Sequence, residues 1–346
     1  MSTQHRVTNK HKLLDENGQV SEPGYSTCQV LDYHRQDIKA CKWRIKEWDY
    51  YYTGNARHAI AMTIADNSYM GLVSVTLFNF IEKWEKTQTL MIPFTFGKLK
   101  IPNVASKGVT EFRNSRVDIS FVNDGKARTL KCNFKNFTKG NDLNADFVVT
   151  DEPEDSMVIA TPFAEDKTAF YYNQKINCMK AKGLVTLGST VYEFNSPDSM
   201  TVLDWGRGVW TYKNTWYWGS MSVVLPDGTP FGFNIGYGFG DTGAATENMI
   251  FYNGKANKLS RTEFQIPIKD GKDDFMSPWK FTSDDGRFEL DFQPILDRYS
   301  YANLLILKSV QHQVFGKFSG KVILDDGKVI ELRDQIGFAE KVYNKF

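Results

Sequence analysis

The 346-residue chain lacks the patterns that usually mark a metal or disulfide site. It has four cysteines, none of them in a Cys-X-X-Cys pair, and its five histidines show no metal-ligand spacing. Scattered cysteines in a large chain indicate free thiols rather than a disulfide framework. Zinc and non-haem iron sites usually show clustered His, Cys or carboxylate ligands, so we expect no metal.

The sequence also lacks a charge excess of one sign and any long hydrophobic run. Its 42 basic and 41 acidic residues give a net charge of +1, which provides no overall field to attract nucleic acid or an anionic membrane. No stretch approaches the ~18 consecutive apolar residues of a membrane span. The polar N-terminal residues lack the apolar core of a signal peptide. We therefore expect a soluble, cytoplasmic protein with no nucleic-acid partner and no integral membrane segment; the oligomeric state stays open.

Motifs for nucleotide binding and for nucleophilic catalysis are missing as well. There is no Walker A loop and no Gly-X-Ser-X-Gly elbow. The segment GFGDTG at 238–243 matches Gly-X-Gly-X-X-Gly, but a strand-like run follows it where a dinucleotide site needs a helix. We therefore expect no cofactor.

What the sequence does contain is period-two alternation of apolar and polar residues. It occurs in RVDISFV (116–122), TLKCNFK (129–135) and RFELDF (287–292), as in antiparallel strands with one buried face. Five Asx-Gly pairs, which favour tight hairpin turns, separate strand-like runs: Asp124-Gly125, Asp227-Gly228, Asn253-Gly254, Asp285-Gly286 and Asp326-Gly327. Helix candidates are few and short, at 32–39 and 296–305. The pattern predicts an all-β chain of consecutive hairpins.

The length of the chain and its hairpins predict two barrels. Closing into a barrel removes the exposed edges of an antiparallel sheet. A barrel of eight to ten strands takes roughly 150–170 residues, so two fit in this chain. We place a loose, polar N-terminal arm at 1–24, a first barrel at 25–181 and a second at 182–346. No Pro/Ser-rich linker separates the halves, so we expect them to pack tightly.

An acid and many aromatic residues are concentrated in one segment, DWGRGVWTYKNTWYWGS at 204–220, which holds four of the eight tryptophans. We expect a strand from Asn214 that places Trp216 and Trp218 on one face, with Asp204 and Arg207 in the connection before it. Burial beside aromatic rings raises the pKa of an acid, which could then protonate an alkene or enol. Indole faces could stabilise the resulting cation.

The same residues also permit a structural interpretation. Asp204 and Arg207 could pair with each other or fix a glycine-rich turn, and an arginine beside the acid would lower its pKa, which opposes proton donation. Glu247 could be a second carboxylate of the site or a rim residue bound to a turn. Tyr237, which is flanked by glycines, could point into a pocket, or the glycines could relieve crowding at a barrel corner. His312 is expected to be an ordinary core or surface histidine.

Six short segments follow one another in a specific order along the chain: LLDENGQVSEPGYS, LDYHRQDIKA, KWRIKEWDYY, LDWGRGVWTYKNTWYWGS, TEN and VFGKFSG. In this order they resemble the family catalogued as domain of unknown function 2804, and the resemblance runs from about Leu13 to Phe346. That family is distantly similar to a lipocalin-like superfamily that includes carotenoid 1,2-hydratase, tocopherol cyclase and the AttH-like proteins. The resemblance implies two tandem calycin-like antiparallel β-barrels and an apolar, isoprenoid or lipid-like ligand.

For the hydratases the resemblance implies an acid that protonates a terminal double bond, and Asp204 is the position matched to it. We therefore predict a cofactor-independent lyase or isomerase that hydrates, isomerises or cyclises a C=C bond of an apolar substrate. Asp204 is the predicted acid and Arg207 its orienting partner. The predicted substrate-binding residues are Trp205, Trp210, Trp216, Trp218, Tyr237 and Glu247. The alternative is a non-catalytic carrier of a hydrophobic ligand, in which Asp204 and Arg207 form a structural latch.

Overall fold

The computed structural model describes residues 4–195, 198–304 and 307–345. In these ranges β-strands, joined by turns and loops, are the main regular structure, and the helical elements are two short 3-10 turns, η1 (Arg35–Asp37) and η2 (Lys42–Arg44). None of the helices in the described ranges has the length and apolar character that crossing a membrane requires.

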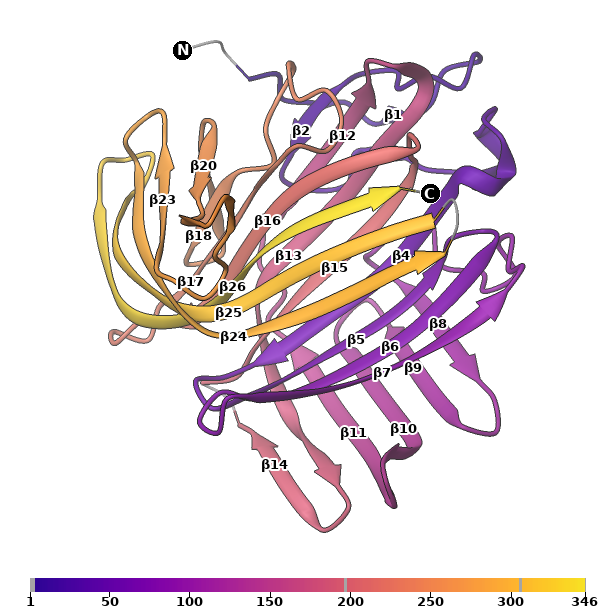
Figure 1. The fold of residues 1–346 in the computed structure, drawn as a ribbon. Coiled ribbons are helices and arrows are strands. Elements are labelled where there is room, and N and C mark those ends of the chain that lie inside the picture. Colours follow the sequence, from indigo (N-terminus) through magenta and orange to yellow (C-terminus); the bar gives the residue numbers. More distant parts are fainter. Residues whose placement is uncertain (1–3, 196–197, 305–306, 346) are drawn as a thin grey trace.

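Two large antiparallel sheets make up the molecule (Figure 1). The main path of the first runs β7-β6-β5-β4-β15-β13-β11-β10-β9-β8. Its strands are β4 (Ile45–Gly54), β5 (His58–Asp66), β6 (Met70–Asn79), β7 (Trp84–Pro93), β8 (Gly108–Arg113), β9 (Val117–Asn123), β10 (Arg128–Thr138), β11 (Asn141–Thr150), β13 (Asp166–Leu187) and β15 (Met200–Val209). Off this path lie β2 (Gly24–Ser26), β12 (Met157–Phe163) and β14 (Thr190–Phe194). A separate small pair joins β1 (His11–Lys12) to β3 (Leu31–Asp32).

The second sheet has the order β19-β18-β17-β16-β26-β25-β24-β23-β20. Its strands are β16 (Lys213–Val224), β17 (Pro230–Tyr237), β18 (Met249–Tyr252), β19 (Lys255–Lys258), β20 (Thr262–Gln265), β23 (Trp279–Ser283), β24 (Phe288–Leu304), β25 (Leu307–Ile323) and β26 (Val329–Lys345). A further two-stranded hairpin consists of β21 (Ile268–Lys269) and β22 (Lys272–Asp273). The long strands β24, β25 and β26 run across the first sheet (Figure 1).

The alternating segments form strands with the predicted buried faces. Val117, Ile119 and Phe121 of β9 are buried, and β10 places its own buried apolar residues directly opposite them. All five Asx-Gly pairs join consecutive strands, and each of their glycines has a positive φ, the backbone conformation that such turns require. Each sheet curls around its own apolar core into a lipocalin-like half-barrel. The prediction of an all-β fold with two tandem lipocalin-like units is confirmed.

The predicted helices are not formed as α-helices. The segment 32–39 contains only η1, and 296–304 belongs to β24, while residue 305 lies outside the described residues. Strand β24 pairs with β25 along nearly its whole length, from Phe288 opposite Val322 to Leu304 opposite Leu307. This long-range pairing outweighs the local helix preference of the segment.

The sheets divide the chain at a different place from the predicted boundary. Residues 181 and 182 lie inside the 22-residue strand β13, and β14 and β15 both pair with β13 in the first sheet. The chain enters the second sheet between Val209 and Lys213. The DWGRG segment is therefore not a connection, because it forms β15, a strand between β13 and β4 whose residues are all buried.

The N-terminal segment is packed against both halves rather than loose. The backbone N–H of His5 donates to Ala244 at 2.8 Å, and the Gln4 side chain donates to the carbonyl of Leu259 at 2.8 Å. Leu13 and Leu14 are buried in the core of the first sheet. Residues 4–24 thus connect the two halves of the molecule, and residues 1–3 lie outside the described ranges.

A bulge in β13 also fastens the sheets together. The register of β13 against β15 shifts between Ile176 and Met179, where Cys178 has a φ of 63°. The Asn177 amide at this bulge donates to Ser220, at 2.9 Å, and to the carbonyl of Phe233, at 3.1 Å, both in the second sheet. A strand of one sheet therefore supplies hydrogen bonds to the other.

Candidate functional site

Two pairs of strands, one from each sheet, line the space between the sheets. In the first sheet β4 pairs with β15, and in the second β16 pairs with β26. Because side chains alternate along a strand, every second residue of these strands points into that space. Tyr50 contacts Trp218 and Tyr52 contacts Phe338 across it, with ring centroids 5.9 and 5.5 Å apart. The side chains that fill this space are therefore arranged in layers, and each layer contains one residue from each of the strands β4, β15, β16 and β26.

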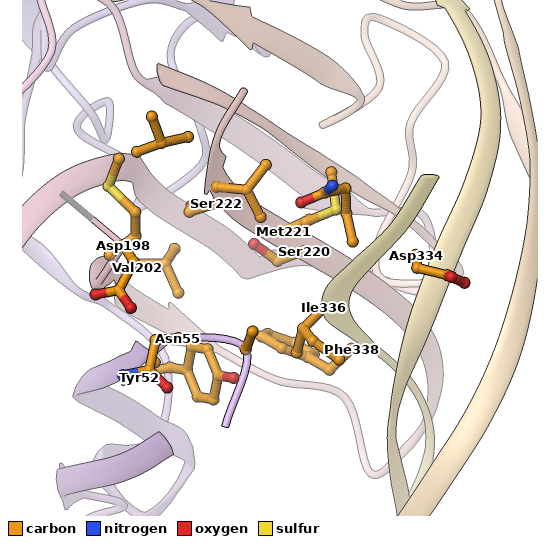
Figure 2. A pocket seen from close by; sticks show the side chains of 17 residues that line it. Tyr52, Asn55, Asp198, Val202, Ser220, Met221, Ser222, Asp334, Ile336 and Phe338 are labelled. Carbon is orange, nitrogen blue, oxygen red and sulfur yellow. The ribbon is translucent and has the colours of Figure 1, made fainter. Parts of the chain in front are cut away.

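The outer layers leave a pocket of about 350 Å³ (Figure 2). Tyr52, Val202, Ser220 and Phe338 form its innermost layer. Polar residues also line it: Asn55, Asp198, Ser222, Asp334 and Gln335. A concave, mainly apolar pocket with a few polar groups is the usual form of a small-molecule site.

The next layer inward contains two carboxyl groups. This layer lies two residues further along each strand than the innermost layer of the pocket, a shift of about 7 Å along the strand. It consists of Tyr50, Asp204, Trp218 and Glu340, and we call it the acid layer. Asp204 comes from the first sheet and Glu340 from the second, and their exposed fractions are 8% and 4%. Neither carboxyl lines the pocket.

Strand β13 holds Asp204 in place. Lys175 lies directly opposite Asp204, and its Nζ donates to Oδ1 at 3.1 Å, while the Asn173 amide donates to the same oxygen at 2.6 Å. The ammonium group also donates to the Tyr171 hydroxyl at 3.1 Å and lies 4.6 Å from the centre of the Trp218 ring. The Lys175 side chain is only 3% exposed, so this is a buried ion pair whose members depend on each other.

Glu247 is a third carboxyl beside the same lysine. Its Oε2 lies 3.9 Å from Lys175 Nζ and accepts a hydrogen bond from the Asn234 amide at 3.1 Å. Asn234 in turn accepts the indole N–H of Trp218 at 2.7 Å. A Cβ at Gly236 would lie 2.8 Å from Glu247 Oε1, so the glycine leaves room for this carboxyl. Burial raises the pKa of Glu247.

Glu340 has the environment of an acid that can exchange a proton near neutral pH. The Trp216 indole N–H donates to Oε1 at 3.0 Å, and the Gln313 amide donates to Oε2 at 3.1 Å. Burial raises the pKa of Glu340 to about 7; the negative charge of Asp204 adds to the rise, and the Trp216 hydrogen bond and the Lys175 charge oppose it. Protonated and ionised forms are therefore both populated at neutral pH.

The pKa of Glu340 predicts that stability depends on pH. Because it is about 7 in the folded protein and ordinarily 4.5, the folded protein binds this proton more tightly than the unfolded chain does. The stabilisation is full below pH 4.5 and is lost as the pH rises through 7. We expect the free energy of unfolding to fall by about 2 kcal/mol between pH 5 and 7.5 through this group.

Urea unfolding at stepped pH measures this effect. Glu340→Gln should flatten the decrease, whereas Glu331→Gln, which changes an exposed acid on the same strand, should leave it unchanged. An undiminished pH slope in Glu340→Gln would show that another group causes it.

Aromatic rings close the space on the far side of the acid layer. Trp48 lies opposite Gly206, where a Cβ would come within 1.9 Å of the indole, so only glycine fits. Trp48 packs edge to face on Trp210 and Trp210 on Trp216, with ring centroids 5.5 and 5.6 Å apart. Phe239 contacts both Trp210 and Trp216. We call these four rings the aromatic wall; the acid layer lies between it and the pocket.

A protein-family model described as a domain of unknown function (DUF2804) matches residues 4–346. The chain belongs to this family. No curated protein matches it. The predicted family is thereby confirmed.

The chain is similar to several solved structures, and the similarity to an AttH-like protein supports a shared fold. An AttH-like protein from Nitrosomonas europaea has a TM-score of 0.54 and 12% identity, over 89% of this chain and 96% of that one. Kievitone hydratase from Nectria haematococca has a TM-score of 0.46 and 12% identity, over 87% and 88% of the two chains. CghA has a TM-score of 0.44 and 8% identity, over 97% of both chains. The predicted distant resemblance to AttH-like proteins is confirmed at the level of the fold.

Most of the predicted site residues of this DUF2804 protein lie together. Asp204 and Trp218 belong to the acid layer. Trp216 donates a hydrogen bond to Glu340 of this layer, and Glu247 accepts one from Asn234, which in turn accepts one from Trp218. Trp210 belongs to the adjoining aromatic wall. Among the described residues, no group of three His, Cys, Asp or Glu side chains is arranged to hold a metal ion.

Trp205, Arg207 and Tyr237 point away from this space. Residues 204 and 207 lie on opposite faces of β15, because their positions differ by three and side chains alternate between the two faces of a strand. The Arg207 guanidinium lies in the first sheet's interior, where it pairs with Asp49 at 3.1 Å and lies 4.0 Å from the centre of the Trp205 ring. Tyr237 packs against the core of the second sheet. The structure thus does not bring Arg207 to Asp204.

The sequence analysis missed Lys175 and Glu340. Glu340 lies between Phe338 and Val342 on one face of β26, so an acid within an apolar stripe could have marked it. No such signal exists for Lys175, because residues 169–179 of β13 are buried on both faces and show no alternation.

Proposed function

We propose that the protein catalyses proton transfer to a carbon–carbon double bond of an apolar, isoprenoid or lipid-like small molecule bound between the two sheets, without a cofactor. The product would be a hydrated, isomerised or cyclised molecule. One observation carries the proposal: carboxyl groups from both sheets lie in one buried layer next to an apolar pocket.

Glu340 is the proton donor in this proposal. With a pKa of about 7 it holds a proton in a large fraction of molecules at neutral pH, and yet can release it. When the proton leaves, the N–H groups of Trp216 and Gln313 remain on the two carboxylate oxygens and stabilise the charge.

Asp204 is assigned the complementary role of base. Its Oδ1 accepts hydrogen bonds from Lys175 and Asn173, so in this geometry Asp204 is an acceptor in the acid layer rather than a donor. After Glu340 protonates one alkene carbon, Asp204 would take a proton either from the adjacent carbon, which gives an isomer or a cyclised alkene, or from a water that adds to the cation. The proton count balances in each case.

The aromatic residues would stabilise the cation between these steps. The Trp218 ring already lies beside a positive charge, the Lys175 ammonium at 4.6 Å, and Trp216 adjoins Glu340 directly. Tyr52 and Phe338 separate the pocket from the acid layer, so the proposal requires the buried Phe338 side chain to turn aside for a substrate to reach Glu340.

Carriage of a hydrophobic ligand without chemistry is the second candidate. It is favoured by the closed floor of the pocket, which keeps Asp204 and Glu340 out of contact with a molecule in the pocket. In that case the Lys175–Asp204 pair joins strands, and the pocket alone binds the ligand.

Deuterium transfer distinguishes the two functions. The wild-type protein is incubated in D2O with a panel of isoprenoid alkenes, and the products are analysed by mass spectrometry. An enzyme of the proposed kind places deuterium on carbon in a hydrated, isomerised or cyclised product. Stoichiometric binding of an alkene with no label on carbon would overturn catalysis and support the carrier.

A further inference from the structure

Three aromatic side chains lie on the surface, away from the space between the sheets. Trp43 of η2 is 52% exposed, and Phe94, in the loop after β7, is 57% exposed. Phe96 packs edge to face on Trp43 with ring centroids 4.9 Å apart, and Phe94 lies against both rings. Met91, which is 65% exposed, extends the apolar surface along β7. Exposed aromatic residues that contact one another form a patch, which scattered surface residues do not.

The backbone holds these rings outward in unfavourable conformations. Phe94 and Phe96 have φ angles of 55° and 46°, a region that bulky residues rarely adopt. Between them Thr95 is buried, and its hydroxyl donates to Asp66 Oδ1 at 2.8 Å. The Gly97 N–H donates to Asp66 Oδ2, also at 2.8 Å. The buried Asp66 thus fixes the loop, and strain maintained in this way is typical of segments with a function.

Four exposed lysines flank the rings: Lys39, Lys42, Lys98 and Lys100. The two segments that carry them, KACKWR at 39–44 and PFTFGKLK at 93–100, contain no Asp or Glu. Among the described residues, none of these four lysines is in an ion pair, as is also true of other exposed lysines such as Lys126. The two segments that carry the rings are therefore positively charged, although Asp66 lies beneath the loop and the whole chain has a net charge of only +1.

We propose that this aromatic-lysine surface (Trp43, Met91, Phe94, Phe96 and the four lysines) docks the protein onto an anionic lipid bilayer. Aromatic rings favour the boundary between headgroups and acyl chains, and lysines are attracted to anionic headgroups. Met91 and the exposed Pro93 extend the apolar area beyond the rings, which suits a hydrocarbon phase better than the stacked bases of a nucleic acid. The inference does not depend on the acid layer.

Vesicle co-sedimentation of the full-length protein tests the proposal. We expect binding to phosphatidylcholine vesicles that contain about a third phosphatidylserine, weaker binding to phosphatidylcholine alone, and release at high salt. The double variant Trp43→Ala/Phe94→Ala should lower the bound fraction about tenfold or more. Lys98→Gln/Lys100→Gln should lower it several-fold and weaken its salt dependence.

A matched control is Ile268→Ala/Val329→Ala, which removes two exposed apolar residues elsewhere and should bind like the wild type. Trp43→Phe keeps most of the apolar area and should still bind. In the wild type we expect brominated lipid to quench the fluorescence of Trp43, and this quenching should be absent in Trp43→Phe. Unchanged binding of Trp43→Ala/Phe94→Ala, or no binding by the wild type, would overturn the proposal. Two other results would also overturn it. One is a dimer of the wild type in solution that Trp43→Ala/Phe94→Ala dissociates, which would make the surface a protein interface. The other is an oligonucleotide that competes with the vesicles for binding, which would indicate a nucleic-acid site.

Discussion

Glu340→Gln is expected to lower the rate of deuterium transfer to a substrate alkene by about 100- to 10,000-fold, the usual contribution of a positioned general acid. The amide keeps the size of the side chain but has no proton to give. The amide keeps one acceptor oxygen for Trp216 or Gln313, and because Glu340 does not line the pocket, substrate binding should change little. Product formation in D2O at pH 7 measures the effect, and Glu331→Gln on the same strand should keep the wild-type rate.

The pH dependence of the rate tests the same assignment. The wild-type rate should be full below pH 7 and should fall above it, because the donor loses its proton as the pH passes its pKa of about 7. Asp204→Asn should lower the rate without removing this fall. If Glu340→Gln stays active and Asp204→Asn abolishes the reaction together with its pH dependence, Asp204 is the acid and the two roles are reversed.

Lys175→Met should lower the free energy of unfolding by about 3–5 kcal/mol, the usual cost of removing one member of a buried ion pair. The ammonium group is the counter-charge that contacts Asp204, and it also lies within 3.9 Å of Glu247. Without the ammonium group, Asp204 and Glu247 would remain buried with hydrogen bonds only from the amides of Asn173 and Asn234. Urea unfolding at pH 7 measures the loss.

Two further variants separate the ion pair from the packing of the lysine. Lys131→Met removes a lysine from an exposed pair with Asp146, both 57% exposed, and should cost less than about 1 kcal/mol. Lys175→Met combined with Asp204→Leu removes both buried charges and should recover much of the stability. If Lys175→Met costs no more than Lys131→Met, the pair does not stabilise the fold as argued.

The strands and turns of this protein could be predicted because their signals are local. The alternation around Val117 and Ile119 and the turn at Asp124-Gly125 depend on residues next to one another in the chain. The same local reasoning failed at Gly206. Glycine in a strand is uncommon and favours a loop assignment, but here it makes room for Trp48, which lies 158 residues earlier.

The site was predicted only in part, because its geometry depends on which strands become neighbours. Asp204 was found from its aromatic surroundings, but its partner is set by the register between β13 and β15, which places Lys175 beside it. Arg207 is three residues from Asp204 and lies on the other face of the sheet. Proximity in the sequence suggested Arg207, and the pairing of distant strands selected Lys175.

The bulge in β13 means that neither half of this chain is a separable module. Asn177 belongs to the first sheet, yet its amide completes the hydrogen bonding of Ser220 and Phe233 in the second. Either half alone would lose these hydrogen bonds and expose to water the apolar surface that the other half covers. Swapping either half for its counterpart from a distant relative would therefore require the bulge and its acceptors to be transplanted together.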